Sequence, residues 1–119
     1  MQEIKGIGFL RMDDKLDNVD YYIGNNLVEE ENLSIKLNLL INKRIDFSLR
    51  VMEDGTVYCE EGILKYDKFR NDVEKLYIVK GNGSYFGLDN LLWYLVGKEI
   101  EIQVNVVNME SSISKEGTM

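Results

Sequence analysis

Two aspartate-bearing segments are the part of this sequence that could support metal-ion chemistry. Asp13 and Asp14 stand beside Lys15 in the first segment, and Asp67 stands beside Lys68 in the second. Carboxylate oxygens are the ligands that Mg²⁺ and Ca²⁺ prefer, and a lysine can bind a substrate phosphate. The three aspartates are therefore the candidate metal ligands of a DNA-nicking site. The alternative is that they are solvated turn residues, because turns are rich in Asp and Asn.

Other kinds of catalysis are restricted by composition. The chain has no histidine and one cysteine, Cys59. A nucleophile activated by histidine is therefore impossible, and zinc sites built from His or Cys side chains are excluded by count. Cys59 alternates with Val57 in a strand-like run, so we expect it to be a buried structural thiol. We expect no catalytic residue and no cofactor.

Acidic and aromatic side chains are the candidate protein-binding groups. The formal net charge is −7 at pH 7, and no concentrated basic stretch is present, so nucleic acid is not the expected partner. Exposed Trp and Tyr are enriched at protein interfaces. The alternatives are that Glu29–Glu31 complement the dipole of a following helix and that Trp93 packs under segment 80–87. The candidate residues are Glu29, Glu30, Glu31, Glu60, Glu61, Trp93 and Tyr94.

The elements that would position these residues occur twice. Residues 33–52 and 88–107 match in pattern without a gap, 55 positions apart (88 − 33 = 55). Each has apolar residues at helical spacing, then a lysine, then a run of alternating apolar and polar residues that is typical of a half-buried strand. Asn42 and Gly97 precede the two lysines, and both tolerate the left-handed conformation that ends a helix. Asn32 can cap the first helix, and Asp89 offers a similar oxygen to the second.

Shorter strands complete the repeated unit. Each copy opens with a strand, 3–12 or 56–66, followed by a polar loop and a short strand near 21–23 or 76–79. Glycines in the opening strands predict bulges or sharp bends; they are Gly6, Gly8 and Gly62. Asp54-Gly55 predicts a tight hairpin with positive φ at both residues.

The predicted fold class is α+β. We expect a tandem duplication of a β-loop-β-α-β unit with pseudo-two-fold symmetry, which forms one antiparallel-rich sheet or barrel with two helices. Residues 1–108 form a single domain of two repeats, 1–53 and 54–108. Residues 109–119 show no periodicity and are expected to be a flexible tail.

The repeated pattern resembles a group of small proteins. G-[FI]-L-[RK]-x-D, Y-I, a helix and [NG]-K-x-I-x-[FI]-x-[LV]-x-V run from Ile4 to Met52 and from Val57 to Val107. This pattern is similar to that of uncharacterised proteins from phages and mobile elements of low-GC bacteria. Some of those are anti-CRISPR proteins, including single-copy ones with a PC4-like nucleic-acid-binding fold. The basic surface of such a nucleic-acid binder is missing from this sequence.

Three functions remain as hypotheses. The first is a non-catalytic phage or mobile-element protein that inhibits a bacterial defence nuclease, for instance a Cas effector, through an acidic surface. The second is a nucleic-acid-binding or metal-dependent DNA-nicking module with a PC4-like fold. The third is a homo-oligomeric structural or accessory protein, such as a homodimer. Without a long apolar run or an apolar signal core, we expect no membrane association and a cytoplasmic location in a bacterial host.

Overall fold

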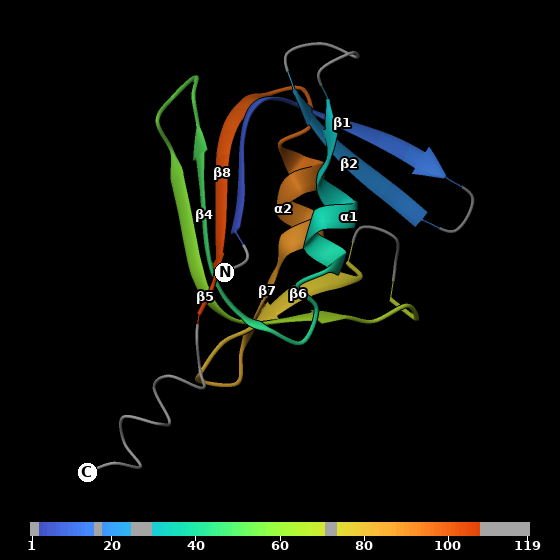
Figure 1. Cartoon of the computed structure of the whole chain (residues 1–119), viewed down its shortest axis with the longest axis vertical. Coiled ribbons are helices and arrows are strands. Elements are labelled where there is room, and N and C mark those ends of the chain that lie inside the picture. Colours follow the sequence, from blue (N-terminus) through green and yellow to red (C-terminus); the bar gives the residue numbers. More distant parts are fainter. Residues whose placement is uncertain (1–2, 16–17, 25–29, 71–73, 108–119) are drawn as a thin grey trace.

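An antiparallel sheet of eight strands curls around two short helices in a computed structural model of the chain (Figure 1). The structure describes residues 3–15, 18–24, 30–70 and 74–107, and the predicted tail 109–119 lies outside them. The elements follow the chain as β1 (Glu3–Lys15), β2 (Asn18–Gly24), β3 (Glu31–Asn32), α1 (Leu33–Asn38), β4 (Arg44–Val51), β5 (Val57–Tyr66), β6 (Leu76–Val79), β7 (Tyr85–Gly87), α2 (Leu88–Tyr94) and β8 (Glu99–Val106). The predicted α+β class is confirmed.

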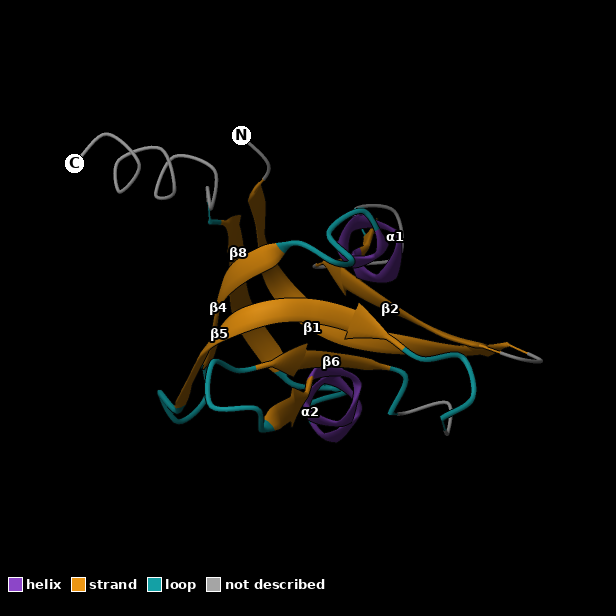
Figure 2. Cartoon of the chain, turned by 90° about the horizontal axis from the view of Figure 1, so that it is seen from below, coloured by secondary structure: helices purple, strands orange, loops and turns teal. Residues whose placement is uncertain are grey.

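The strand order in the sheet is β3-β2-β1-β8-β4-β5-β6-β7. The sheet forms a half-barrel, and both helices lie inside its curve (Figure 1). Seen from below, α1 lies beside β2 and α2 lies beside β6 (Figure 2). The apolar residues of the helices and of the concave sheet face therefore meet in one core.

Alternation along β4 and β8 supplies the central layer of this core. Phe47 and Leu49 of β4 are buried, as are Ile102 and Val104 of β8. Each buried side chain of this size contributes roughly 1.5–3 kcal/mol relative to an exposed one. The helices add their apolar faces, which consist of Leu33 and Leu37 in α1 and of Leu88, Leu91 and Leu92 in α2. The predicted alternation of β4 and β8 and the apolar faces of both helices are confirmed, except that Val96, which was expected on the apolar face of the second helix, is 38% exposed.

Each of the long strands β1 and β5 pairs with two neighbours in succession. β1 pairs with β8 up to Phe9 and with β2 from Phe9 onward. β5 changes from β4 to β6 at Ile63 in the same way. A glycine directly precedes each change of pairing partner. Gly8 has a φ of +147°, and a Cβ at this position would lie 2.7 Å from the backbone of Gly24. A Cβ on Gly62 would overlap the carbonyl oxygen of Val79. Gly8 and Gly62 therefore lie where a strand changes its partner, whereas Gly6 pairs with Ile102 within the uninterrupted β1–β8 ladder, which contains no bulge.

The two halves of the chain use the same pairing registers. Tyr22 pairs with Asn32 in the first half, and 55 residues later Tyr77 pairs with Gly87. Where the halves meet, Ser48 of β4 lies opposite Gln103 of β8, its counterpart at the same offset (103 − 48 = 55).

Hydrogen bonds between the halves also correspond. Leu10 donates to the carbonyl of Lys98 and accepts from Gly97, at 3.0 and 2.8 Å. Leu64 donates to the carbonyl of Lys43 and accepts from Asn42, at 3.0 and 2.7 Å. The first strand of each half is therefore held by the turn that precedes the last strand of the other half.

Helix ends and turns follow the sequence only in part. Asn32 caps α1 by accepting a hydrogen bond from the Ile35 amide at 3.0 Å, and Asn42 and Gly97 have φ of +71° and +90°, as predicted. The helices end earlier than expected, at Asn38 and Tyr94, so Asn42 and Gly97 lie in the turns that follow them. α2 begins after Gly87 without a side-chain cap, because the Asp89 carboxylate is bonded elsewhere.

Three further expectations about strands and turns were wrong. β1 continues through Lys15, so Asp13 and Asp14 lie in a strand and not in a loop. Two short edge strands, β3 and β7, were not expected. The hairpin turn has positive φ at Gly55 and not at Asp54. Asp54 instead accepts a hydrogen bond from the Thr56 amide at 2.9 Å, which stabilises a wider turn.

The predicted burial of Cys59 was also wrong, because Cys59 is exposed. Directly opposed residues of an antiparallel pair lie on the same face of the sheet. Phe47, which is in the core, lies opposite Glu60, whereas Cys59 lies opposite Ser48 on the outer face. Because Val57 and Cys59 are apolar, the sequence had suggested that they face the core and that Glu60 faces solvent. Neither helix in the described part of the chain is long and apolar enough to cross a membrane.

We predict that Gly62→Ala lowers the free energy of unfolding by about 2 kcal/mol or more, because the new methyl group would overlap a backbone carbonyl of β6. Urea titration followed by circular dichroism measures this change. Gly81→Ala is the matched control, since a Cβ at Gly81 meets no atom within 4 Å. Equal stability of the two variants would contradict the proposed close approach of β5 and β6.

Candidate interaction surfaces

Glu30, the best-shielded of the described acidic candidates, forms a bidentate pair with Arg11. The Arg11 guanidinium donates to the two carboxylate oxygens of Glu30 at 2.7 and 2.8 Å. These bonds lower the pKa of Glu30 and raise that of Arg11. The guanidinium also lies 4.5 Å from the centroid of the Tyr22 ring. Only 11% of the Glu30 side chain is exposed, so this residue offers a partner little free negative charge.

The remaining described acidic candidates are also paired, but less completely. Glu31 pairs with Lys36 at 2.6 Å, Glu61 with Arg44 at 3.1 Å and Glu60 with Lys80 at 2.8 Å. The side chains of Glu31 and Glu61 are half-exposed, whereas that of Glu60 is mostly covered. They come from β3 and β5, which four strands separate in the sheet order. Glu29 lies outside the described residues.

Trp93 and Tyr94 project from the solvent side of α2. Their exposed fractions are 53% and 69%, while the preceding Leu91 and Leu92 are buried. Trp93 occupies the position of the polar and exposed Asn38 in the first half (93 − 38 = 55). The residue that corresponds to Tyr94 in the first half is Leu39, which directly follows α1 and is also exposed. The two helices therefore carry different apolar groups to the surface, and the aromatic pair is unique to α2.

The three candidate metal ligands do not form one site among the described residues. Asp13 lies opposite Asp20 in the β1–β2 pair, and Asp14 lies opposite Val19. Asp67 follows β5 and accepts a hydrogen bond from the Phe69 amide at 3.0 Å, which stabilises its own turn. Within the part of the chain that the structure describes, no three His, Cys, Asp or Glu side chains are grouped so that they could hold a metal ion.

A cluster of one arginine and two tyrosines on the outer face of β6 and β7 was missed by the sequence analysis. The Arg70 guanidinium lies 4.4 Å from the centroid of the Tyr77 ring and 4.6 Å from that of Tyr85. The two rings meet edge-on with centroids 5.6 Å apart. Lys65 shares this face, since it lies opposite Tyr77 in the β5–β6 pair. We call these four residues the Arg70 cluster.

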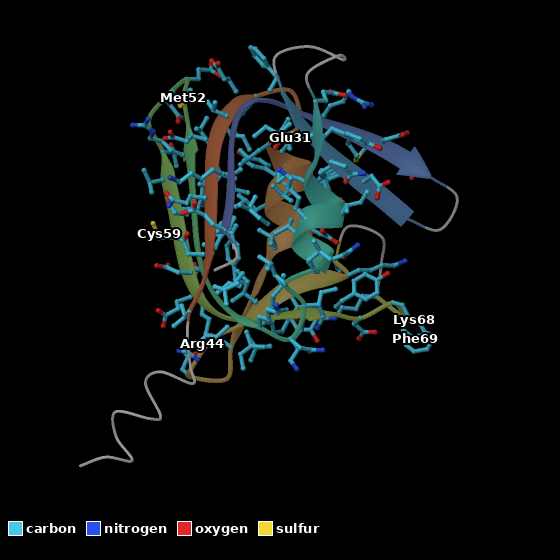
Figure 3. All side chains as sticks on the ribbon, viewed as in Figure 1. Glu31, Arg44, Met52, Cys59, Lys68 and Phe69 are labelled. Atoms are coloured by element: carbon cyan, nitrogen blue, oxygen red, sulfur yellow. The ribbon has the colours of Figure 1, made fainter. Side chains whose placement is uncertain are left out.

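The Arg70 cluster has a counterpart with different chemistry in the other half. Arg11 over Tyr22 occupies the place of Lys65 and Tyr77, and Glu30 occupies the place of Tyr85 (85 − 30 = 55). Glu30 neutralises Arg11 at hydrogen-bond distance, whereas Arg70 forms a longer ion pair with Asp67, at 3.9 Å. The second half therefore presents two aromatic rings beside Arg70, where the first half presents one ring beside an arginine–glutamate pair. Lys68 and Phe69 project from the preceding turn, at the end of the molecule away from Cys59 (Figure 3).

An open groove of about 730 Å³ lies on the outer face of the central strands. Its floor contains the Arg50–Glu101 ion pair, 3.0 Å long, and Gln103. Ile7 of β1 and Val57 of β5 line it as well. The outward side chains of β4 and β8 that line it are polar: Ser48, Arg50, Glu101 and Gln103.

A buried polar cluster joins the two halves near the helices. The amide of Leu76 donates to Oδ2 of Asp89 at 3.0 Å, and the Tyr21 hydroxyl donates to the carbonyl of Asp89 at 3.2 Å. The Tyr21 amide donates to Oγ of Ser34 at 2.9 Å, so Tyr21 links β2 to both helices. Burial raises the pKa of Tyr21. A cavity of about 280 Å³ lies beside Ser34 and Asp89.

Asp89 is the titratable group of this cluster. It is 9% exposed, and burial raises its pKa to about 6, against the lowering effect of hydrogen bonds from the amides of Leu76 and Lys75 and of the Lys75 charge. The sequence signal for this role was weak: Asp89 occupies the position of Ser34 in the other half, at the start of a helix, where an acidic residue is common for reasons of capping. The arrangement can bind or release a proton at a pH of about 6.

No protein-family model, curated protein or solved structure matches this chain.

We predict that the contribution of Asp89 to the unfolding free energy falls as the pH rises from about 4 to about 7. The raised pKa of Asp89 means that the folded state binds a proton more tightly than the unfolded state, whose carboxyl has a pKa near 3.8. The stabilisation is complete below the unfolded value and is lost as the pH rises through the folded value. The shift corresponds to at most about 3 kcal/mol.

Asp89→Asn is the control for this pH dependence, because it removes the titration while it keeps one oxygen that can accept from the Leu76 amide. Denaturant titrations of both proteins at several pH values should give curves that diverge with pH. Parallel curves would show that Asp89 does not titrate in this range.

Proposed function

We propose that this protein is a non-catalytic phage or mobile-element protein that binds and inhibits a bacterial defence nuclease in the bacterial cytoplasm. The exposed Trp93–Tyr94 pair on α2 is the observation that carries the proposal. A solvent-exposed helix surface rarely carries two adjacent large aromatic side chains. Aromatic side chains of this kind provide much of the binding energy in many protein interfaces. The resemblance of the repeated pattern to anti-CRISPR proteins supports the choice of a nuclease as the partner.

The acidic side chains have a secondary role in this proposal. Nucleases that bind nucleic acid have basic channels, and acidic groups on an inhibitor increase its rate of association with such a surface. Glu31 and Glu61 are the acidic candidates with the most exposed side chains. Since each has a cationic neighbour of its own, we assign them to steering and assign the anchoring of the complex to Trp93 and Tyr94.

We predict that Trp93→Ala weakens inhibition of a purified Cas effector nuclease by roughly 30-fold, because loss of a central aromatic contact costs about 2 kcal/mol. The measurement is the concentration of protein that halves cleavage of target DNA by the guide-loaded nuclease. Leu39→Ala is the matched control, because Leu39 is an exposed apolar residue at the end of α1 and corresponds to Tyr94 in the first half.

The control variant should inhibit as well as the native protein, and higher ionic strength should slow association. Equal inhibition by both variants would remove Trp93 from the interface. A native protein that inhibits no defence nuclease and is captured by none would refute the function itself.

Single-stranded nucleic acid binding is the second candidate function, and the Arg70 cluster favours it. Proteins that bind single strands combine cations with aromatic rings on which bases stack. Tyr85 is exposed beside Arg70, and Phe69 is almost fully exposed beside Lys68, whose ammonium lies 5.2 Å from the ring centroid. These side chains place two cations, Lys68 and Arg70, beside exposed aromatic rings at one end of the protein. The proposal requires no metal ion.

We predict that Tyr85→Ala weakens binding to labelled oligothymidine at low salt by about tenfold, because each stacked base contributes about 1–3 kcal/mol. Fluorescence anisotropy gives the dissociation constant. Tyr22→Ala is the matched control, as Tyr22 has the same contact with a cation that Glu30 neutralises. Absence of binding by the native protein, or an equal loss in both variants, would eliminate this function.

We also propose that the two halves arose by tandem duplication and are related by a pseudo-two-fold axis between Ser48 and Gln103. The repeated registers and the corresponding hydrogen bonds at Leu10 and Leu64 support this origin. Superposition of residues 3–51 on residues 57–106 is the direct check. A backbone deviation as large as that between unrelated folds would argue against duplication.

A further inference from the structure

The outer edge of β5 has no strand beside it over residues 57–62 in the described part of the chain. β4 pairs with one edge of β5 from Val57 to Ile63, and β6 pairs with the other edge only from Ile63 to Tyr66. In Figure 1, β5 is accordingly the outermost strand of this side of the sheet. An open edge of this length is a site at which another strand can pair.

The hydrogen-bonding groups on this edge follow from the pairing with β4. The Val51 amide donates to the carbonyl of Thr56 at 2.8 Å, and the Leu64 amide donates to the carbonyl of Lys43 at 3.0 Å. Hydrogen-bonded pairs alternate with non-bonded pairs in an antiparallel ladder, so the even-numbered residues of β5 bond to β4. The amide and carbonyl groups of Val57, Cys59 and Glu61 therefore point away from β4 and towards solvent.

Charge does not prevent a strand from approaching this edge. The two glutamates on it, Glu60 and Glu61, form ion pairs with Lys80 at 2.8 Å and with Arg44 at 3.1 Å within the same molecule. Val57 is 54% exposed and Cys59 is exposed. No lysine or proline lies among residues 57–62, although these are residues that commonly block free edges.

We infer that two copies of this protein pair antiparallel through this edge, with Cys59 of one copy opposite Cys59 of the other. This register places Val57 opposite Glu61 and Tyr58 opposite Glu60, so no glutamate faces a glutamate. The three outward amides of each copy then meet the three outward carbonyls of the other, which gives six hydrogen bonds. A second copy is the occupant that the edge itself specifies, because the register is symmetric about Cys59 and satisfies every outward group.

The dimer goes beyond the proposed inhibitory function and leaves its surface free. Trp93 and Tyr94 belong to α2, which lies inside the curve of the sheet and away from β5 (Figures 1 and 2). An antiparallel pair of edges has two-fold symmetry and closes on itself, so it yields dimers and not fibres. Each dimer would present two copies of the α2 surface.

The dimer is tested by sedimentation equilibrium together with a nitroxide spin label on Cys59. The measured mass should approach that of two chains as the concentration rises, and the label on Cys59 should show strong dipolar broadening. The matched control carries the label on a cysteine at position 48, in a Ser48→Cys, Cys59→Ser protein. Ser48 lies opposite Cys59 one strand further from the edge, so its two labels are about 10 Å further apart and should broaden much less.

A proline variant tests the backbone contacts. Cys59→Pro removes an outward amide and none of the amides that bond to β4, so it should raise the dissociation constant of the dimer by at least about tenfold. Lys5→Pro, at the corresponding position of β1, should leave that constant unchanged, and circular dichroism verifies that both variants fold. A single-chain mass at all concentrations would overturn the proposal. A dimer whose Cys59 label is not broadened, or one that Lys5→Pro dissociates, would place the contact elsewhere and would overturn it equally.

Discussion

Pairing between β4 and β8 is the interaction on which the rest of this structure depends. Each is the last strand of its half of the chain, and each pairs on its other side with the first strand of the opposite half. Neither half can therefore complete its part of the sheet alone. The same pairing places Phe47, Leu49, Ile102 and Val104 in one apolar layer against which both helices pack. A change that loosens β4 from β8 would separate the halves and expose this layer.

The curvature of the sheet follows from what β1 and β5 must do around that central pair. Each long strand begins beside the central strands and ends beside a short strand of its own half, with a glycine at the change. The bend encloses the helices, and it also determines which backbone groups remain unpaired. Because β6 joins β5 only beyond Gly62, the preceding residues keep an open edge. The closure of the core and the availability of the edge thus have the same geometric cause.

The candidate binding surfaces lie where the two halves differ chemically on a shared backbone. Glu30 in one half, which neutralises Arg11, corresponds to Tyr85 in the other, where Arg70 from the preceding turn lies over the rings of Tyr77 and Tyr85. Asn38 similarly corresponds to Trp93 on the exposed side of the second helix. Ser34 corresponds to Asp89, which makes the buried cluster titratable near neutral pH. Common positions maintain the fold, and the divergent positions give each half its own chemistry.

The sequence by itself determined the repeated order of elements, the two apolar helix faces and the alternation of the last strand in each half. These features depend on local periodicity and on turn residues such as Asn42 and Gly97, whose backbone preferences act over a few residues. Only the tertiary structure decided which residues of β5 face the core. Glu60 lies opposite the buried Phe47, so its neighbour Cys59 faces solvent. It also decided which acidic residues are neutralised, and it brought Arg70 onto Tyr77 and Tyr85. Such contacts join residues that are distant in the chain, and no local preference encodes which partner a strand edge or a long side chain will reach.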